Sequence, residues 1–307
     1  MIKAVIDVGS NSIKMRIANV SEKSGEVHII RDETEVVRLG RGMSETGVLS
    51  DESMKNSCLT VSKMARKAER AGAKIFIVGT MALRTAKNSD TFIKMIKKST
   101  GHEIHVFSGE QEAKYSWLGA VDGFEAEGKN LIMFDSGGGS TEFVAGEKHI
   151  ASIPVGAVNL SEKFFSEHDK PIKKIYVDKA FEHVKNLLLE NNIDKFRSDS
   201  IENQIIGVGG GIVSMASVKF ACENYIPSKL HGSTLTQNDV LRQIQIYSSL
   251  TLKERENVIG LPASRADVIL GSACIILATL KILNCQSCIV SINGLRHGIL
   301  LSDNIIT

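Results

Sequence analysis

The sequence lacks an excess of charge of either sign. Lys and Arg together number 37 and Asp and Glu number 35, which leaves a formal net charge of +2 at pH 7. Proteins dedicated to nucleic acid usually carry a basic excess, so this balance argues against a nucleic-acid partner. It does not exclude an anionic ligand, because a few basic groups in a cleft are enough to bind one.

Long hydrophobic runs are also missing. The most apolar stretch, Val268 to Leu280, covers about 13 residues, whereas a helix that spans a bilayer needs about 20. Near the start of the chain, Asp7 stands where a signal peptide would need its apolar segment. We therefore expect no membrane partner and a cytoplasmic location.

Cysteines are few, five in 307 residues, and their number is odd. This is typical of reduced thiols and not of a disulfide framework. Cys285 and Cys288 form a C-x-x-C pair, for which zinc binding or redox chemistry is the alternative interpretation. The pair lies at the edge of an apolar strand without the second pair of ligands that zinc needs, so we favour structural thiols.

What the sequence does contain is typical of soluble globular proteins. Hydrophobic residues make up 43% and charged residues 23%, which excludes a disordered or fibrous chain. A length of 307 residues favours two domains over one.

Two segments of the chain share one pattern. Residues 5–14 read VIDVGSNSIK, and residues 132–142 read IMFDSGGGSTE. Each is an apolar strand that ends in Asp-x-Gly, followed by small polar residues and a second strand. The repeat, with Asp7 and Asp135 at equivalent places, predicts two domains of one architecture.

Strand-like and helical segments alternate after each hairpin, which predicts an α/β fold with one sheet per domain. Residues 122–129 are polar and contain glycine, so we place an N-terminal domain at 1–125 and a C-terminal domain at 126–307. The first is expected to hold strands at 26–39, 74–79 and 103–107 and helices at 52–71, 90–98 and 110–121. The second is expected to hold strands at 149–155, 204–209 and 288–292 and helices at 174–191, 237–249 and 265–283, with a last helix from 294.

Three glycine-bearing turns follow predicted strands, at residues 9–12, 137–141 and 207–211. Glycine lets a ligand approach the chain, and the exposed N–H groups of such turns suit phosphate oxygens. The third turn also opens a helix, whose dipole favours an anion. Hairpins need glycine in any case, so a single turn is weak support. Three such turns in one chain favour phosphate binding, especially because two of them follow an Asp at the same distance along the sequence.

Asp7 and Asp135 each end an apolar strand, where a carboxylate is costly unless it is paired, hydrogen-bonded or bound to a metal. One interpretation is that each caps its own turn. The other is that they face each other across a cleft and hold Mg²⁺, with Glu142 as a further ligand.

At these residues the chain resembles the exopolyphosphatase / guanosine pentaphosphate phosphohydrolase family, within the superfamily of actin, sugar kinases and heat-shock ATPases. The resemblance runs nearly end to end. It rests jointly on the segments at 7–12, 79–88, 108–113, 135–142, 260–267 and 294–298.

The resemblance implies two ribonuclease-H-like (actin-like ATPase) domains with the active site in the cleft between them. It also implies removal of the terminal phosphate from inorganic polyphosphate or from guanosine pentaphosphate (pppGpp), with Mg²⁺ or Mn²⁺. Glu112 would orient or deprotonate the attacking water, and Arg84 would contact the phosphate chain. Asp135 and Glu142 would serve the metal and the water, and the position of Asp7 at its own strand end adds it as a candidate metal ligand. The phosphate-binding residues would be Gly9, Ser10, Asn11, Ser12, Gly137, Gly138, Gly139, Ser140 and Thr141, with Gly209, Gly210 and Gly211 on the adenosine side.

The chain departs from the family pattern around two of these segments. Ser136 stands after Asp135 where an aliphatic residue is usual. Ile292 and His297 stand where the family has acids around its Gly-Leu-Arg segment, so no role is carried over to them or to Arg296.

Two other functions remain open. One is a kinase of the same superfamily, and the other is a non-catalytic sensor that binds polyphosphate or pppGpp. The residues favour hydrolysis because a carboxylate stands at each expected position, but they do not choose between the two substrates. The apolar tail Ile299 to Ile306 is compatible with a homodimer contact.

Overall fold

The computed structural model describes residues 1–21, 25–124, 127–146 and 149–302. The chain forms two compact units: the first is Met1–Gly119 with Asn293–Thr307, and the second is Ala120–Ile292. The expected domain boundary between residues 125 and 126 falls outside the described residues.

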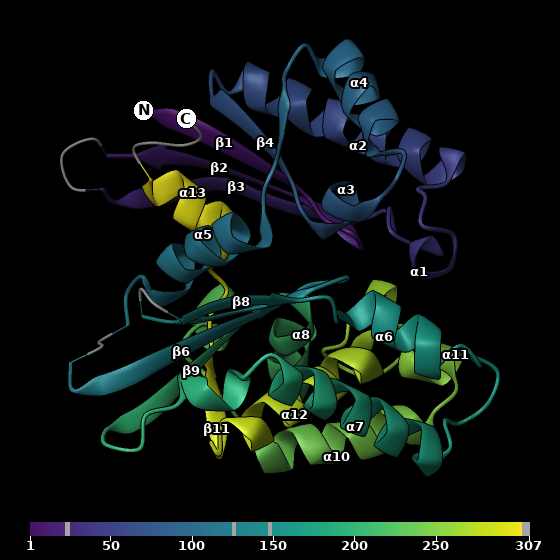
Figure 1. Ribbon diagram of the computed structural model, residues 1–307. Coiled ribbons are helices and arrows are strands. Elements are labelled where there is room, and N and C mark those ends of the chain that lie inside the picture. Colours follow the sequence, from purple (N-terminus) through teal and green to yellow (C-terminus); the bar gives the residue numbers. More distant parts are fainter. Residues whose placement is uncertain (22–24, 125–126, 147–148, 303–307) are drawn as a thin grey trace. The chain divides into compact units, whose positions relative to one another are not determined.

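The first unit is built on a five-stranded sheet in the order β3-β2-β1-β4-β5. Strands β1, β2 and β3 pair antiparallel, and β1, β4 and β5 run parallel. Helices α2 and α4 cover one face and α13 covers the other (Figure 1). Helix α2 begins at Asp51 because Ser50 caps it, its side chain accepting a hydrogen bond from Ser53 N. The elements of this unit are β1 (Ile2–Val8), β2 (Ser12–Val20), β3 (Val27–Val36), α1 (Met43–Thr46), α2 (Asp51–Arg70), β4 (Lys74–Gly79), α3 (Met81–Thr85), α4 (Ser89–Thr100), β5 (Ile104–Val106), α5 (Gly109–Val121, which runs into the second unit) and α13 (Leu295–Leu301).

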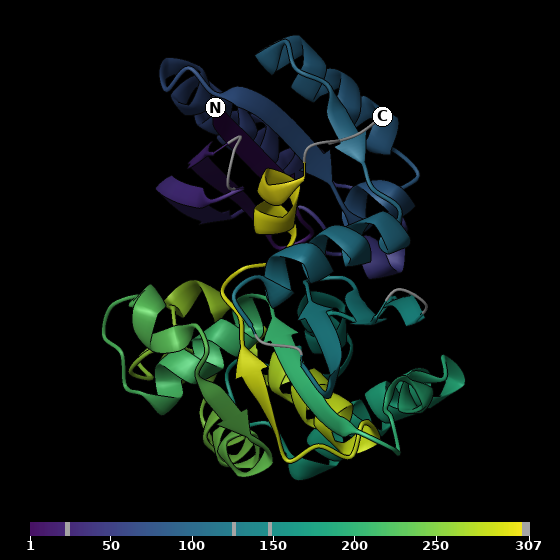
Figure 2. The ribbon, with the colours of Figure 1, turned by 90° about the vertical axis from the view of Figure 1, so that its left-hand side faces the viewer.

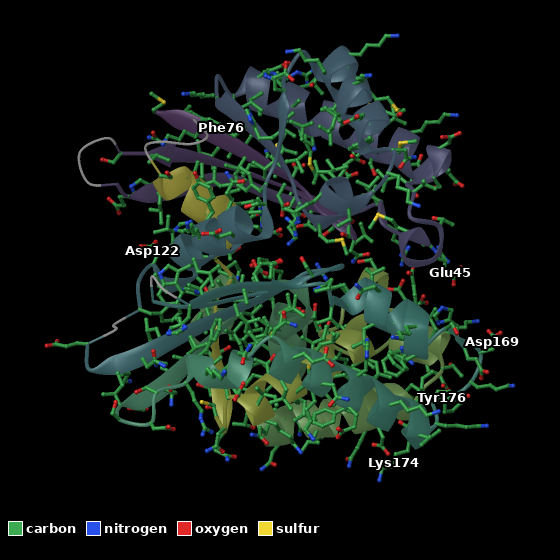
Figure 3. All side chains as sticks on the ribbon, viewed as in Figure 1. Glu45, Phe76, Asp122, Asp169, Lys174 and Tyr176 are labelled. Carbon is green, nitrogen blue, oxygen red and sulfur yellow. The ribbon has the colours of Figure 1, made fainter. Side chains whose placement is uncertain are left out.

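The second unit holds a six-stranded sheet in the order β8-β7-β6-β9-β11-β10. Figure 2 shows β11 (yellow) beside β9 (green), although 78 residues separate the end of β9 at Val208 from the start of β11 at Ser287. Its core lies between the sheet and its helices, and charged side chains such as Asp169 and Lys174 lie on the surface (Figure 3). The elements are β6 (Lys129–Ser136), β7 (Thr141–Ala145), β8 (His149–Ile153), α6 (Ala157–Phe164), α7 (Lys174–Glu190), η1 (Ile193–Phe196), β9 (Glu202–Val208), α8 (Gly210–Lys219), α9 (Pro227–Leu230), β10 (Thr234–Thr236), α10 (Gln237–Ser249), α11 (Leu252–Arg255), η2 (Ala263–Arg265), α12 (Ile269–Ile282) and β11 (Ser287–Val290).

The two sheets repeat one topology, and their hairpins match residue for residue. In each sheet the first two strands pair antiparallel, and three strands run parallel: β1, β4 and β5 in the first sheet, and β6, β9 and β11 in the second, where β10 adds an antiparallel edge. Gly9 N donates to Ser12 O at 3.1 Å, and Gly137 N donates to Ser140 O at 2.9 Å. The predicted duplication and the predicted α/β class with two ribonuclease-H-like units are confirmed.

The last helix, α13, packs in the first unit and not in the second. Leu295, Ile299 and Leu300 are buried against Val5 and Ala18 on the first sheet. The sequence predicted that this helix belongs to the second domain, because it follows that domain along the chain. Chain order does not show which sheet face still lacks an apolar cover, so the prediction was wrong for α13. Ile299 and Leu300 are buried within this unit and do not offer a dimer surface, and the end of that tail, from residue 303, lies outside the described residues.

The structure also bears on three smaller expectations. The helix expected at 265–283 begins at Ile269, because a 3-10 turn, η2, occupies Ala263–Arg265. Among the described helices, none is long and apolar enough to cross a bilayer. The five cysteines are free thiols, and burial raises the pKa of Cys288 to about 12, which argues against the redox interpretation of the C-x-x-C pair.

Candidate functional site

The first glycine turn, at residues 9–12, is held from behind by the chain that follows β3. Ser10 O accepts a hydrogen bond from Gly40 N at 2.8 Å, and Asn11 O accepts from the N–H groups of Val37 and Arg38 at 3.0 and 2.8 Å. In a trans peptide the N–H points opposite to the C=O, so the next N–H groups, of Asn11 and Ser12, point away from this support. Such a turn can receive an anion.

The second turn, at residues 137–140, is built in the same way by the chain that follows β8. Gly137 O and Gly138 O accept from Ala157 N and Val158 N at 3.0 and 2.8 Å, at the start of α6. The approach is tight: a Cβ on Gly156 would lie 2.4 Å from Gly139 N. Thr141, which the sequence predicted as a phosphate-binding residue, follows this turn and is buried. The Thr141 hydroxyl donates a hydrogen bond to Val155 O at 2.6 Å.

Strand pairing brings Asp135 and Glu142 together at this turn. They stand opposite each other on β6 and β7, and Glu142, only 1% exposed, accepts a hydrogen bond from Ser152 Oγ at 2.8 Å. Their neighbours Phe134 and Phe143 face the helical core, so the two carboxylates lie on the opposite face of the sheet. In the first unit the residues at the equivalent positions are Asp7 and Lys14, so an acidic side chain there stands opposite a basic one.

The carboxylates fit a magnesium site of the open kind. Mg²⁺ is usually held by one or two carboxylates with waters and substrate phosphates, and Asp135 with Glu142 provide such a pair. Within residues 1–21, 25–124, 127–146 and 149–302, no group of three or more His, Cys, Asp or Glu side chains gathers as a complete protein cage. The predicted contribution of Asp7 stays a prediction.

Arg84 and Glu112, 28 positions apart in the sequence, form an ion pair in the first unit. Arg84 Nη1 donates to Glu112 Oε2 at 2.9 Å and to Phe107 O at 2.8 Å. Arg84 comes from α3, and Glu112 comes from the first turn of α5, where the helix dipole favours an acid. The ion pair fixes the orientation of the Glu112 carboxylate. A carboxylate that is to orient a water molecule needs such a fixed orientation.

The third turn, at residues 209–211, lies beside Asp135. Val208 pairs with Asp135 across β9 and β6, and a Cβ on Gly209 would lie 3.4 Å from Asp135 Oδ1. The guanidinium of Arg265 fills the space over Gly210, where a Cβ would lie 2.0 Å from its Nη2. Burial lowers the pKa of Arg265, and the nearby Asp267 partly offsets this.

Arg265 is a residue that sequence reasoning did not assign. Its segment, 260–267, was among those that carried the resemblance, which was the available signal. No pattern along the chain placed it over a glycine turn 55 positions earlier.

Arg296 and His297 belong to a buried network in the first unit. Asp32 on β3 accepts hydrogen bonds from Arg16 and from Arg296 of α13, and His297 Nδ1 lies 3.3 Å from Arg16 Nη1. The arrangement ties the start of α13 to the sheet. Arg296, and His297 as one of the departures from the family pattern, therefore have a structural role in this unit.

The chain is similar to known proteins over most of its length. The model of the Ppx/GppA phosphatase family matches residues 17–305. Exopolyphosphatase 2 of Mycobacterium tuberculosis is 28% identical over 89% of this chain and 88% of its own. A guanosine-5'-triphosphate,3'-diphosphate pyrophosphatase of Photobacterium profundum is 30% identical over 96% of this chain. The crystal structure of the Ppx/GppA family member of Aquifex aeolicus has a TM-score of 0.80 at 30% identity, covering 99% of this chain and 97% of that one.

Some of these relatives are longer. The chain spans 58% of the Photobacterium protein and 46% of a bifunctional 3-dehydroquinate synthase/phosphatase of Fusobacterium nucleatum, which is 29% identical over 98% of this chain.

Proposed function

The chain belongs to the Ppx/GppA phosphatase family, and from that premise we propose that it hydrolyses the terminal phosphoanhydride bond of inorganic polyphosphate or of pppGpp. One observation carries the proposal most directly. In the second unit a turn built to receive an anion stands beside two carboxylates that strand pairing holds together.

The chemistry requires mostly positioning and charge neutralisation. A transferring phosphoryl group spreads negative charge over its oxygens, which backbone N–H groups of the turns and the Arg84 guanidinium can stabilise. Glu112, which Arg84 holds in place, orients the attacking water or accepts a proton from it.

Mg²⁺ or Mn²⁺ would be held by Asp135 and Glu142, with Asp7 as the further proposed ligand. When bound, the ion neutralises charge on the phosphate oxygens. Ser152 helps to orient the Glu142 carboxylate, because its hydroxyl donates a hydrogen bond to Oε1.

The test is phosphate release by the purified chain with Mg²⁺, from short polyphosphate, long polyphosphate and pppGpp. Glu112→Gln should lower kcat by about 10²–10⁴-fold, the usual contribution of a general base, and leave tripolyphosphate binding in place. Glu110→Gln is the matched control, because Glu110 lies in the same helical turn, 64% exposed, and pairs with Lys114 at the surface. Equal rates in the two variants would remove Glu112 from this role. ATP formation on adding ADP would assign the chain to the kinases instead.

A further inference from the structure

The geometry assigns Asn159 as the residue that positions the second turn, residues 137–140, for anion binding. This inference rests on the proposed function and adds a residue that touches neither substrate nor metal. Asn159 lies in the first turn of α6, 20 positions after the carbonyl that it holds.

All three glycine carbonyls of the turn are occupied from the side of α6. Gly137 O and Gly138 O accept backbone N–H groups of the helix, and Gly139 O accepts from Asn159 Nδ2 at 2.9 Å. Because N–H and C=O point in opposite directions in a trans peptide, the N–H groups of Gly138, Gly139 and Ser140 point away from the helix together. Three successive N–H groups facing one way form a concave site for a phosphate oxygen.

The third carbonyl differs from the other two because only a side chain holds it. Any sequence that forms α6 supplies the backbone N–H groups that bond to Gly137 and Gly138. The bond to Gly139 requires a donor of the right reach at position 159. Without it, the Gly139 peptide is free to rotate and turn its carbonyl, which repels phosphate, toward the anion.

The orientation of the Asn159 amide is fixed by its own contacts. Its Oδ1 accepts from Gly156 N at 2.8 Å, while Nδ2 donates to Gly139 O and, at 3.3 Å, to Pro154 O. A flipped amide would set an oxygen against two carbonyls and an NH₂ group against an N–H. The donor therefore stays on the side of the turn.

The first turn has no such dependence. Its carbonyls at Ser10 and Asn11 are held by backbone N–H groups of Gly40, Val37 and Arg38. Of the two duplicated turns, the one beside Asp135 and Glu142 is thus the one whose conformation a single side chain controls.

The test measures tripolyphosphate binding to the full chain by calorimetry, without divalent metal, and then KM and kcat with Mg²⁺. Asn159→Ala should raise the Kd for tripolyphosphate and the KM about three- to tenfold, the range expected for one hydrogen bond. Amide NMR signals of Gly138, Gly139 and Ser140, which should shift on adding tripolyphosphate to the wild type, should shift less in the variant.

The matched control is Asn203→Ala. Asn203 braces another turn of the second unit in the same way, donating to Ser198 O at 2.8 Å and accepting from Ser198 N at 2.7 Å, at the opposite end of β9 from Val208. It should lower the melting temperature as much as Asn159→Ala does, with Kd and KM unchanged. An Asn159→Ala protein with wild-type Kd and KM, or with changes equal to those of the control, overturns the assignment. A wild type that binds tripolyphosphate but releases no phosphate from any substrate overturns the proposed function alone, because the Kd comparison still decides the role of Asn159.

Discussion

Replacing Asp32 with Asn should destabilise the first unit because it leaves two arginines without their shared anion. Arg16, 2% exposed, donates to Asp32 Oδ2 through Nε at 2.9 Å and Nη2 at 2.6 Å, and Arg296 donates to Oδ1. Asn offers one oxygen and turns an NH₂ group toward a guanidinium. Breaking a buried pair in this way costs about 3–5 kcal/mol, and we expect about 3 because the Asp32 side chain is 29% exposed.

The loss should depend on pH in a defined direction. Burial raises the pKa of Asp32, but Arg296 and Arg16 lower it by more, so its pKa lies below the ordinary value of 3.8. A carboxyl whose pKa is lower in the folded state stabilises the fold above its unfolded pKa and loses that contribution as pH falls through the folded value. The difference between wild type and Asp32→Asn should therefore be complete at pH 7 and shrink below about pH 4.

Urea unfolding, followed by circular dichroism at several pH values, measures this difference. Glu33→Gln is the control on the same strand, since Glu33 pairs with Arg31 and Lys67, whose side chains are 50% and 41% exposed. Exposed pairs contribute about 0–1 kcal/mol. Equal losses in the two variants, or a loss for Asp32→Asn that persists undiminished at pH 3, would refute the account of the buried network.

Three further outcomes follow from packing and burial. Gly298→Ala should lower the melting temperature, because its Cβ would lie 1.8 Å from Tyr115 O and overpacking costs about 1–3 kcal/mol; an unchanged melting curve would contradict this contact. Tyr247→Phe should cost about 1–2 kcal/mol in urea unfolding, since it leaves the buried Gln243 Oε1 without the hydroxyl that donates to it at 2.6 Å; a neutral result would refute that bond. Cys288, whose pKa burial raises to about 12, should resist iodoacetamide at pH 8 until the protein is denatured, as mass spectrometry can show; labelling of the native protein would count against its burial.

Local pattern was enough to predict the two hairpins and the carboxylates at their strand ends. An apolar strand that ends in Asp-x-Gly specifies a buried strand, a tight turn and a carboxylate at the strand end, all within about ten residues. Because the same pattern occurs twice, the matching topology of the two sheets and the equivalence of Asp7 and Asp135 could also be predicted, and the structure confirms both features.

Contacts between distant segments could not be predicted in this way. The resemblance named Arg84 and Glu112 separately, and only the packing of α3 near the start of α5 makes them an ion pair. Asn159 reads along the chain as an ordinary residue of a helix. Its role as a brace follows from the return of the chain after β8 to the turn between β6 and β7.

The sequence by itself determined the α/β class, the duplicated turns and the acids at the strand ends, because hydrophobic periodicity and glycine act over a few residues. Only the tertiary structure decided which unit takes α13, which cation meets Glu112 and what holds each turn in place. Those choices depend on which surfaces remain uncovered once the sheets have formed, and no short stretch of sequence contains that information.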